Sequence, residues 1–257
     1  MGEPIAPTVH LVAGTDGPAI LLLHGFGADR FGWLVNQQEL AAAGRVYALD
    51  LPGHGKTPLA GAGRLPDLVA AVERAIEGAG IGPVHIVAHS LGGAIAIALA
   101  AQRPDLVRSL ALIAPAGLGA DIDAKFLSEF QRSQSAAETE ALLHRLVSRP
   151  RLINRFMVAG VEKQLAIPGS RDALIAIAED LGRMDAVIEA SLQAVAKSAL
   201  PRLTIWGEAD TIVPLDRKRL ASFGGESLIV EGAAHLPHIE FARAVNERLV
   251  NWLSARR

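Results

Sequence analysis

Short apolar runs alternate along this chain with longer stretches of helical periodicity, and no other feature of the sequence constrains the fold more. Four runs lie in the first half, at residues 19–24, 45–50, 84–89 and 108–114, and two follow at 202–206 and 226–230. Each is almost continuously hydrophobic, as expected for strands of a sheet that helices cover on both faces. The pattern predicts an α/β fold with a mostly parallel central sheet flanked by helices.

The stretches between these runs have apolar residues at three- and four-residue spacing. We predict helices there that cross from one strand to a neighbouring one, over 65–78, 91–102, 215–222 and 239–253. With 257 residues, half of them hydrophobic, the chain is long enough to bury a substantial core.

The sequence changes in character between residues 117 and 200, where strand-like runs stop and Ala, Leu, Glu and Arg recur with helical periodicity. We predict four helices there, separated by proline and glycine, over 121–132, 135–147, 151–166 and 170–181. The segment 117–200 is therefore interpreted as a helical cap, inserted between two parts of one core, 1–116 and 201–257. Such a cap would roof a pocket and select the substrate. The alternative is a packed extension of the core.

Charge and cysteine content narrow the classes of function. The 25 basic and 27 acidic residues leave a formal net charge of −2, so no basic field exists to attract nucleic acid or an anionic membrane. The absence of cysteine excludes disulfides, thiolate metal sites and a cysteine nucleophile. The N-terminus lacks a signal-peptide pattern, and no apolar segment reaches 18 residues. We expect a cytoplasmic protein that acts on a small molecule, with no nucleic-acid or membrane partner; its oligomeric state is open.

The segment AHSLGG, residues 88–93, joins a predicted strand to a predicted helix. A serine on so sharp a turn exposes its hydroxyl, and small residues two positions before and after it let strand and helix approach closely. Ala88 and Gly92 hold those positions, although the usual pattern has glycine where Ala88 stands. The positive end of the helix would also favour a developing oxyanion. Ser90 is the predicted nucleophile; the alternative is an ordinary N-cap serine.

A second signal lies upstream, in the segment HGFG at residues 24–27, directly after the first apolar run. A loop in this place can aim a backbone N–H at a reacting carbonyl, beside the N–H of the residue that follows the serine. We therefore predict an oxyanion hole formed by the amides of Phe26 and Leu91. The alternative is a glycine-rich turn without a catalytic role.

A serine needs a base within hydrogen-bond reach, and the base needs a carboxylate that fixes its tautomer. Asp210 lies in WGEAD, just past the run at 202–206, and His235 lies in EGAAH, past the last run. Both would lie at the carboxyl edge of the sheet, where open α/β folds place their sites. We predict a triad of Ser90, His235 and Asp210, in the order known for a nucleophile on such a turn.

Other motifs are weaker. GHGKT at residues 53–57 ends like a phosphate-binding loop, but that loop requires glycine where Asp50 stands. His235 and His238 are three residues apart, yet no H-E-x-x-H pattern or carboxylate at ligand spacing accompanies them. His24 is expected to brace the HGFG loop, and His54 and His89 to have structural roles. We expect neither a cofactor nor a metal.

As a set, HGFG, DLPGHG, AHSLGG, WGEAD and GAAH resemble the α/β-hydrolase superfamily, and the resemblance extends from about Ile20 to Arg257. More narrowly, residues 34–55 and 109–130 are similar to the hydrolase-like domain fused to the acyltransferase subunit (dihydrolipoyllysine-residue acetyltransferase) of acetoin dehydrogenase complexes. Acyl transfer there depends on a lipoyl domain and an H-x-x-x-D-G motif, and this chain shows neither. The resemblance implies an α/β-hydrolase core without a lipoyl domain.

We therefore expect a serine hydrolase that cleaves a small-molecule ester or thioester through an acyl-enzyme, with a link to acetoin dehydrogenase left open. Two alternatives remain. One is a carbon–carbon bond hydrolase with the same triad, which needs a polar group to bind an enolate. The other is a non-catalytic docking module of an acetoin-type complex.

Overall fold

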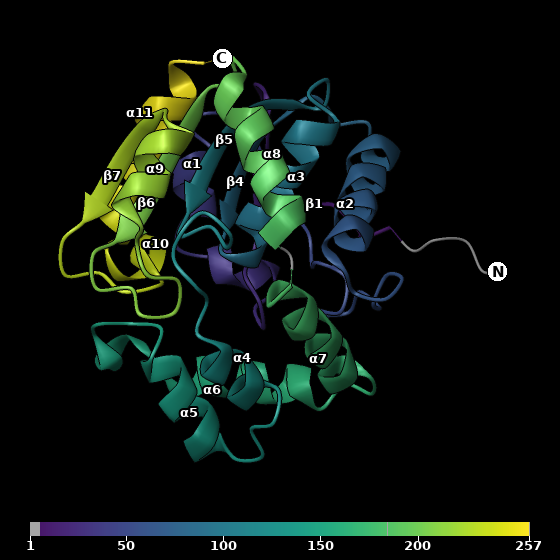
Figure 1. The fold of residues 1–257 in the computed structure, drawn as a ribbon, viewed down its shortest axis with the longest axis vertical. Helices are drawn as coiled ribbons and strands as arrows, with labels where there is room; N and C mark the ends of the chain where they lie inside the picture. Colours follow the sequence, from purple (N-terminus) through teal and green to yellow (C-terminus); the bar gives the residue numbers. More distant parts are fainter. Residues whose placement is uncertain (1–5, 184, 257) are drawn as a thin grey trace.

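The computed structural model describes residues 6–183 and 185–256, which form a seven-stranded sheet with helices on both sides (Figure 1). The strand order is β1-β3-β2-β4-β5-β6-β7. The strands are β1 (His10–Ala13), β2 (Ala19–Leu23), β3 (Arg45–Ala48), β4 (Val84–His89), β5 (Val107–Ile113), β6 (Arg202–Gly207) and β7 (Glu226–Val230).

The sheet is parallel from β3 to β7, and β1 alone pairs antiparallel, with β3 at one edge. The α/β fold with a mostly parallel sheet is thereby confirmed, and the six predicted runs correspond to β2–β7. The central strands β2 and β4 are buried along their whole length, which explains their unbroken apolar sequences. Strand β1 was not predicted, because its four residues lie at the edge of the sheet, none of them is buried, and they carry no alternating pattern.

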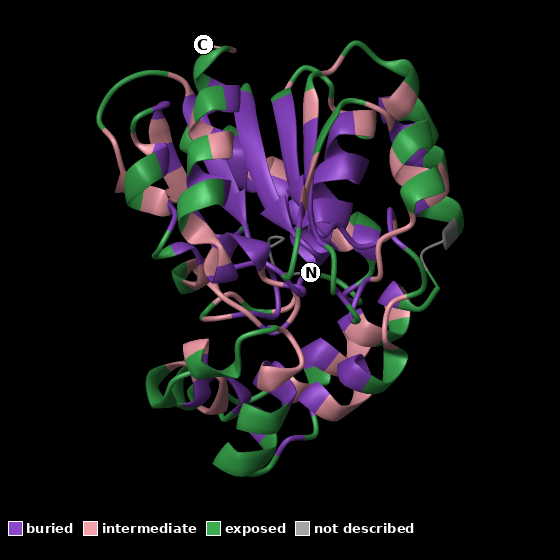
Figure 2. Ribbon diagram, turned by 90° about the vertical axis from the view of Figure 1, so that its left-hand side faces the viewer, coloured by how far each residue is buried: buried purple, intermediate pink, exposed green. Residues whose placement is uncertain are grey.

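Helices cover both faces of the sheet. One face packs against α2 (Leu65–Ala79), α3 (Leu91–Gln102), α8 (Asp185–Lys197) and α9 (Arg217–Phe223), and the other against α1 (Gln37–Leu40) and α11 (Ala242–Ser254). Along β2 the side chains alternate between these two apolar clusters, as the pleat of a strand requires. Figure 2 shows buried residues concentrated in the sheet and on the helix faces turned toward it.

A separate layer of helices lies beyond the sheet, at the lower end of Figure 1. It comprises α4 (Ala124–Phe130), α5 (Ala136–His144), α6 (Arg155–Leu165) and α7 (Ser170–Leu181), with the short η2 (Pro150–Leu152) between α5 and α6. Each of these α-helices falls within one of the four helical stretches predicted for the cap. We call this layer, α4 to α7 with η2, the cap; its role as a cap over the site remains a prediction.

Helix α8 belongs to the predicted cap segment 117–200 by sequence, but it packs against α3 beside the sheet. The sequence analysis did not separate it from the cap helices, because its periodicity is equally helical. We propose that the cap ends between α7 and α8, so that α8 counts with the core. Within the described residues, no helix combines the length and apolar character needed to cross a bilayer.

Candidate active site

Ser90 lies on the sharp turn between β4 and α3. Its backbone has φ 50° and ψ −114°, a conformation that non-glycine residues rarely adopt. The turn is held on both sides, because the Ser90 amide donates to the Ile113 carbonyl and the Ser90 carbonyl accepts from the amides of Gly93, Ala94 and Ala116. The hydroxyl makes no capping hydrogen bond to α3. A capping role therefore does not account for the serine, and the packed turn maintains the strain.

Asp210 and His235 meet past the ends of β6 and β7. The Nδ1 atom of His235 lies 2.8 Å from Oδ2 of Asp210, and both side chains are buried. The other carboxylate oxygen, Oδ1, accepts from the amides of Ile212 and Val213 at 2.9 and 3.0 Å. With Nδ1–H donating to the carboxylate, Nε2 of His235 carries the lone pair that can accept a proton.

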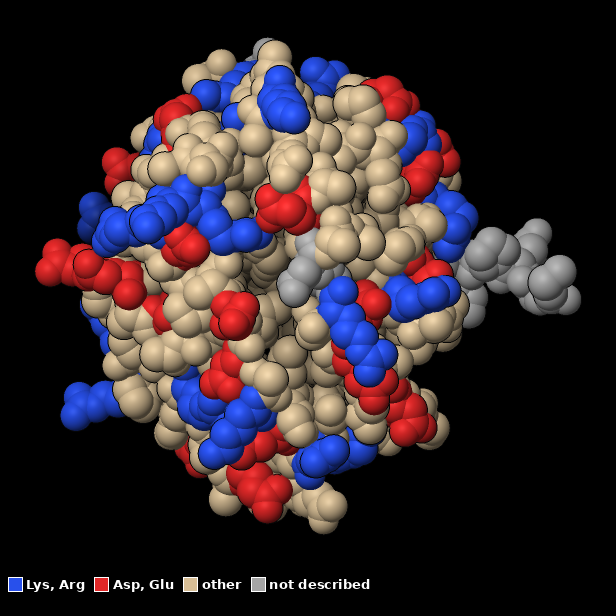
Figure 3. Space-filling model, viewed as in Figure 1, with Lys and Arg blue, Asp and Glu red and all other residues tan. Residues whose placement is uncertain are grey.

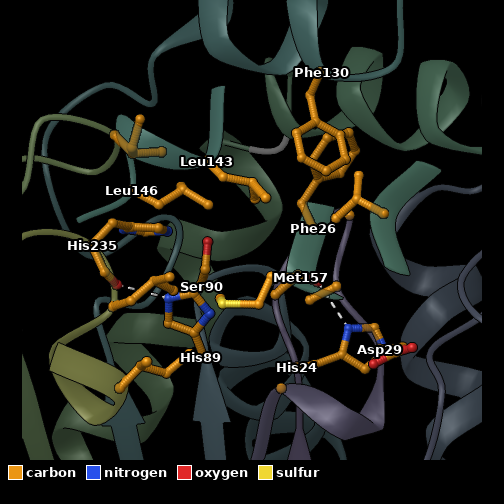
Figure 4. Close-up of a pocket in the computed structure, with 18 of the residues that line it drawn as sticks. His24, Phe26, Asp29, His89, Ser90, Phe130, Leu143, Leu146, Met157 and His235 are labelled. Atoms are coloured by element: carbon orange, nitrogen blue, oxygen red, sulfur yellow. Dashed lines mark hydrogen bonds between the residues drawn. The ribbon is translucent and has the colours of Figure 1, made fainter. Parts of the chain in front are cut away.

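Ser90 and His235 line the same cavity, whose volume is about 600 Å³. Figure 4 shows both side chains in this cavity, with Leu143 and Leu146 of the cap above them in the view. Among the described residues no hydrogen bond joins the Ser90 hydroxyl to the imidazole. Catalytic hydrogen bonds are often longer in a free enzyme and shorten when substrate binds.

Phe26, whose amide is expected to contribute to an oxyanion hole, lines this cavity, whereas Leu91 is not among the described residues that line it. Leu91 begins α3 immediately after Ser90, and Phe26 lies in the turn that follows β2. In the described part of the chain neither amide N–H donates to a backbone or side-chain acceptor. Gly25, beside Phe26, approaches the site so closely that an added Cβ would lie 2.6 Å from His89 Nδ1 and 3.2 Å from Ser90 Cβ.

Two buried histidines hold the loop of Phe26 in place. Nε2 of His54 accepts from the Gly27 amide at 3.0 Å, and Nε2 of His24 accepts from the Leu51 amide at 2.9 Å. Nε2 therefore carries no proton in either ring, and both imidazoles are neutral. Burial lowers the pKa of His24, and burial together with the neighbouring His24 lowers the pKa of His54 to about 3. The bracing role expected for His24 is supported by these bonds, and His54 has a similar one.

His89 and His238 pack behind His235. Nε2 of His89 donates to the backbone carbonyl of His235 at 3.0 Å, and its ring centroid lies 4.7 Å from that of His235. Burial, followed by the charges of His235 and His238, holds the pKa of His89 well below its usual value. Burial and the charge of His235 lower the pKa of His238 to about 3. His89 therefore supports, as a neutral ring, the backbone that carries His235.

Glu240, which was not predicted, is a buried carboxylate on the short helix α10 (Pro237–Glu240). Its Oε1 accepts from the Ala234 amide at 2.7 Å, and its Oε2 accepts from the amide and hydroxyl of Ser148 at 2.7 and 2.6 Å. Ser148 lies between α5 and η2 of the cap, whereas Ala234 precedes His235. The Glu240 side chain thus links the cap to the loop that carries His235 by hydrogen bonds. No local sequence motif marks Glu240.

Gln164 on α6 was also missed. It lines the cavity, is buried, and its Nε2 has no hydrogen-bond partner among the described residues. Of the described residues, no group of three or more His, Cys, Asp and Glu side chains is arranged to hold a metal ion. His235 and His238, the pair weighed as metal ligands, each contact the ring of His89, with centroids 4.7 and 4.8 Å from it.

Comparison with known proteins gives consistent results. The model of a family described as the alpha/beta hydrolase family matches residues 20–248. The acetyltransferase component of the acetoin cleaving system of Pseudomonas putida is 34% identical over 248 residues, which cover 94% of this chain but only 65% of that protein. The chain therefore spans less than two thirds of that relative's length.

Two further similarities cover nearly whole chains. A pimeloyl-[acyl-carrier protein] methyl ester esterase of Neisseria meningitidis is 30% identical over 88% of this chain and 89% of its own. The crystal structure of a meta-cleavage product hydrolase from Pseudomonas fluorescens superposes with a TM-score of 0.87, covering 100% of this chain and 98% of that one at 21% identity. This last similarity concerns the fold alone.

Proposed function

The chain belongs to the alpha/beta hydrolase family, and from that premise we propose that it hydrolyses a small-molecule ester or thioester through an acyl-enzyme on Ser90. The observation that supports this most is the pairing of His235 with a buried Asp210 at 2.8 Å, in the cavity that a strained Ser90 also lines. In this proposal Ser90 supplies the nucleophile, His235 the base and Asp210 the group that orients the base.

In the proposed reaction the Ser90 oxygen attacks the carbonyl carbon while Nε2 of His235 takes the hydroxyl proton. The amides of Phe26 and Leu91 donate to the resulting oxyanion. When the intermediate collapses, His235 passes the proton to the departing alcohol or thiol; water then attacks the acyl-enzyme with His235 again as base and releases the acid. General-base assistance contributes about 10² to 10⁴ in rate, and one oxyanion donor about 10² to 10³.

The cavity lining favours an ester over the carbon–carbon alternative. Breaking a carbon–carbon bond leaves an enolate, whose charge a cation or several donors must stabilise. The described residues around the cavity include no lysine or arginine, and the cap contributes the carboxamides of Asn154 and Gln164. An alkoxide leaving group, by contrast, needs only the proton that His235 carries.

The comparisons support an ester substrate independently of the cavity. The Neisseria relative is named as a methyl ester esterase. A link to acetoin cleavage remains part of the proposal through the Pseudomonas putida relative. A docking module without catalysis would have no need of the strained serine beside a paired histidine.

Labelling with a fluorophosphonate probe tests the proposal. The folded protein should be labelled at Ser90, and Ser90→Ala should lose both the label and the hydrolysis of 4-nitrophenyl acetate. Ser109→Ala, at a buried serine on β5 that hydrogen-bonds to His85, is the matched control. Absence of labelling in folded wild-type protein would favour the docking module instead.

A further inference from the structure

The cavity of Ser90 opens through an apolar rim. Seven large hydrophobic residues are exposed among the described residues, and four of them line this one cavity. They are Phe31, Leu34, Val35 and Phe156, with exposed fractions of 54, 58, 51 and 73%. Single exposed hydrophobic residues need no explanation, but a group at the entrance of a pocket marks a binding surface. We call these four residues the rim.

The two phenylalanines of the rim are held by matching turns, one from the core and one from the cap. In the first, the Asp29 carboxylate accepts from the Phe31 amide, and in the second the Asn154 side chain accepts from the Phe156 amide, each at 2.9 Å. Arg30 and Arg155 stack over the phenyl rings that follow them, at 4.4 and 4.9 Å. The backbone that carries each ring is therefore held, and each ring has one arginine contact, which reduces the entropy lost when a ligand binds there.

Apolar surface continues from the rim into the cavity. Phe130 contacts the rings of Phe26 and Phe126, with centroids 5.8 and 5.7 Å apart, and Leu143, Leu146 and Met157 lie nearer to Ser90 (Figure 4). All six line the cavity, and the described lining contains no Lys or Arg. An anionic substrate would lose its hydration there without a lysine or arginine to pair with. A neutral chain would exchange water for apolar contacts.

From this continuity we propose that the substrate is a neutral ester with an apolar chain, which runs from Ser90 through the cavity and ends against the rim. The inference rests on the proposed ester hydrolysis and names the substrate class of the same site. A volume of about 600 Å³ lies in the range of pockets that enclose drug-sized ligands. It can therefore hold a chain of many carbons beside the ester group.

Kinetics with esters of increasing chain length test the proposal. One series varies the acyl chain (4-nitrophenyl acetate to dodecanoate) and another the alcohol chain (alkyl butyrates), all at concentrations where the esters are monomeric. In the series whose chain follows the cavity, kcat/KM should rise about three- to fourfold per methylene group, until the chain reaches the rim. Phe31→Ser and Phe156→Ser should each lower kcat/KM for the longest esters about fivefold. That loss should shrink as the chain shortens.

Leu11→Ser is the matched control, because Leu11 is 55% exposed on β1 and does not line the cavity. Its chain-length profile should equal that of the wild type. Three results would overturn the inference: no dependence on length in either series, the same loss in the rim variants for every ester, or a rim effect seen only with esters in micelles or vesicles. The last result would identify the rim as a surface for lipid aggregates.

A binding measurement separates failure of this inference from failure of the proposed function. Ser90→Ala can be titrated with neutral methyl ketones, 2-butanone to 2-dodecanone, using the fluorescence of Trp33, which lines the cavity. Affinity should increase with chain length, and Phe31→Ser in the same background should weaken the longest ketone most. If wild-type protein hydrolyses no ester but this pattern holds, the chain site exists without the proposed chemistry. Ester hydrolysis with no such pattern would contradict the chain site alone.

Discussion

The residues of the site are positioned by neighbours that approach them very closely. Gly25 is the clearest case, since any side chain there would meet the rings and carbons of His89 and Ser90. His89 in turn supports the backbone carbonyl of His235. A methyl group at Gly25 would thus disturb the nucleophile and the support of the base together.

We expect Gly25→Ala to lower kcat/KM for short esters at least about tenfold, because small displacements at a catalytic site have large effects on rate. The variant should stay folded, since the imidazole and the Ser90 side chain can shift. Circular dichroism and ester hydrolysis measured together check this. Gly160→Ala lines the same cavity with no atom within 4 Å of the added Cβ, and serves as the control. Wild-type activity in Gly25→Ala would contradict the account of this contact.

Among the elements, the contact between β2 and α3 limits the choice of residue next to the turn of Ser90. A Cβ at Gly92, in the first turn of α3, would lie 2.6 Å from the carbonyl oxygens of Leu23 and His24. These are backbone atoms of the central sheet and cannot move aside cheaply. The glycine two residues after Ser90 is therefore required by packing, as the sequence motif indicates.

We expect Gly92→Ala to reduce the free energy of unfolding by about 1–3 kcal/mol, the usual cost of overpacking. Gly78→Ala should instead increase it by about 0.5–1 kcal/mol, because this exposed glycine of α2 has open space around it and alanine favours a helix. Urea denaturation measures both. Equal effects of the two substitutions would show that close packing at Gly92 is not what constrains it.

The elements also show how far sequence reasoning reaches. The buried strands and the helix after Ser90 were predicted because their hydrophobic patterns lie within short segments of sequence. Asp210 and His235 were found because each follows the end of a predicted strand. The rim of Phe31 and Phe156 was not, because a phenylalanine after Asp-Arg or Asn-Arg has no local sign of exposure. Glu240 was missed for a similar reason: its partners Ala234 and Ser148 come together only in the fold.

For the molecule as a whole, Glu240 joins the cap to the core. Hydrogen bonds to an ionised acceptor contribute about 1.5–3 kcal/mol. Glu240→Gln keeps the size but replaces one acceptor oxygen by a donor, so either the buried amide of Ala234 or the part-buried amide of Ser148 loses its partner. We expect the free energy of unfolding to fall by about 2 kcal/mol, and KM to rise more than kcat falls, as the cap loosens. Glu247→Gln on the exposed side of α11 is the control. If it changes the free energy of unfolding and KM to the same extent, Glu240 does not join the cap to the core.

Buried neutral histidines should make the stability of the whole molecule depend on pH. The pKa values of His54 and His238 are lowered to about 3 by burial, whereas unfolded histidines titrate near 6.5. Between these values the unfolded chain binds more protons than the folded one, so stability is fully present above about pH 6.5 and falls as the pH falls. The window extends from about 6.5 down to about 3.

His54→Gln should therefore flatten the dependence of the unfolding free energy on pH, by up to about 1.4 kcal/mol per pH unit between pH 6 and 5. Urea denaturation at half-unit steps of pH measures this slope. His144→Gln on the cap, where the ring is half-exposed, controls for loss of a histidine elsewhere. An unchanged slope in His54→Gln would mean that its ring is charged in the folded protein.

The central claim is that an acyl group passes through Ser90. Quenching the protein with acid during turnover of a 4-nitrophenyl ester, followed by intact mass and peptide mapping, tests it most directly. The expected result is an added acyl mass on the peptide that contains Ser90, which disappears when the ester is exhausted and never forms in Ser90→Ala. Steady turnover without that adduct, or the same adduct in Ser90→Ala, would contradict the account.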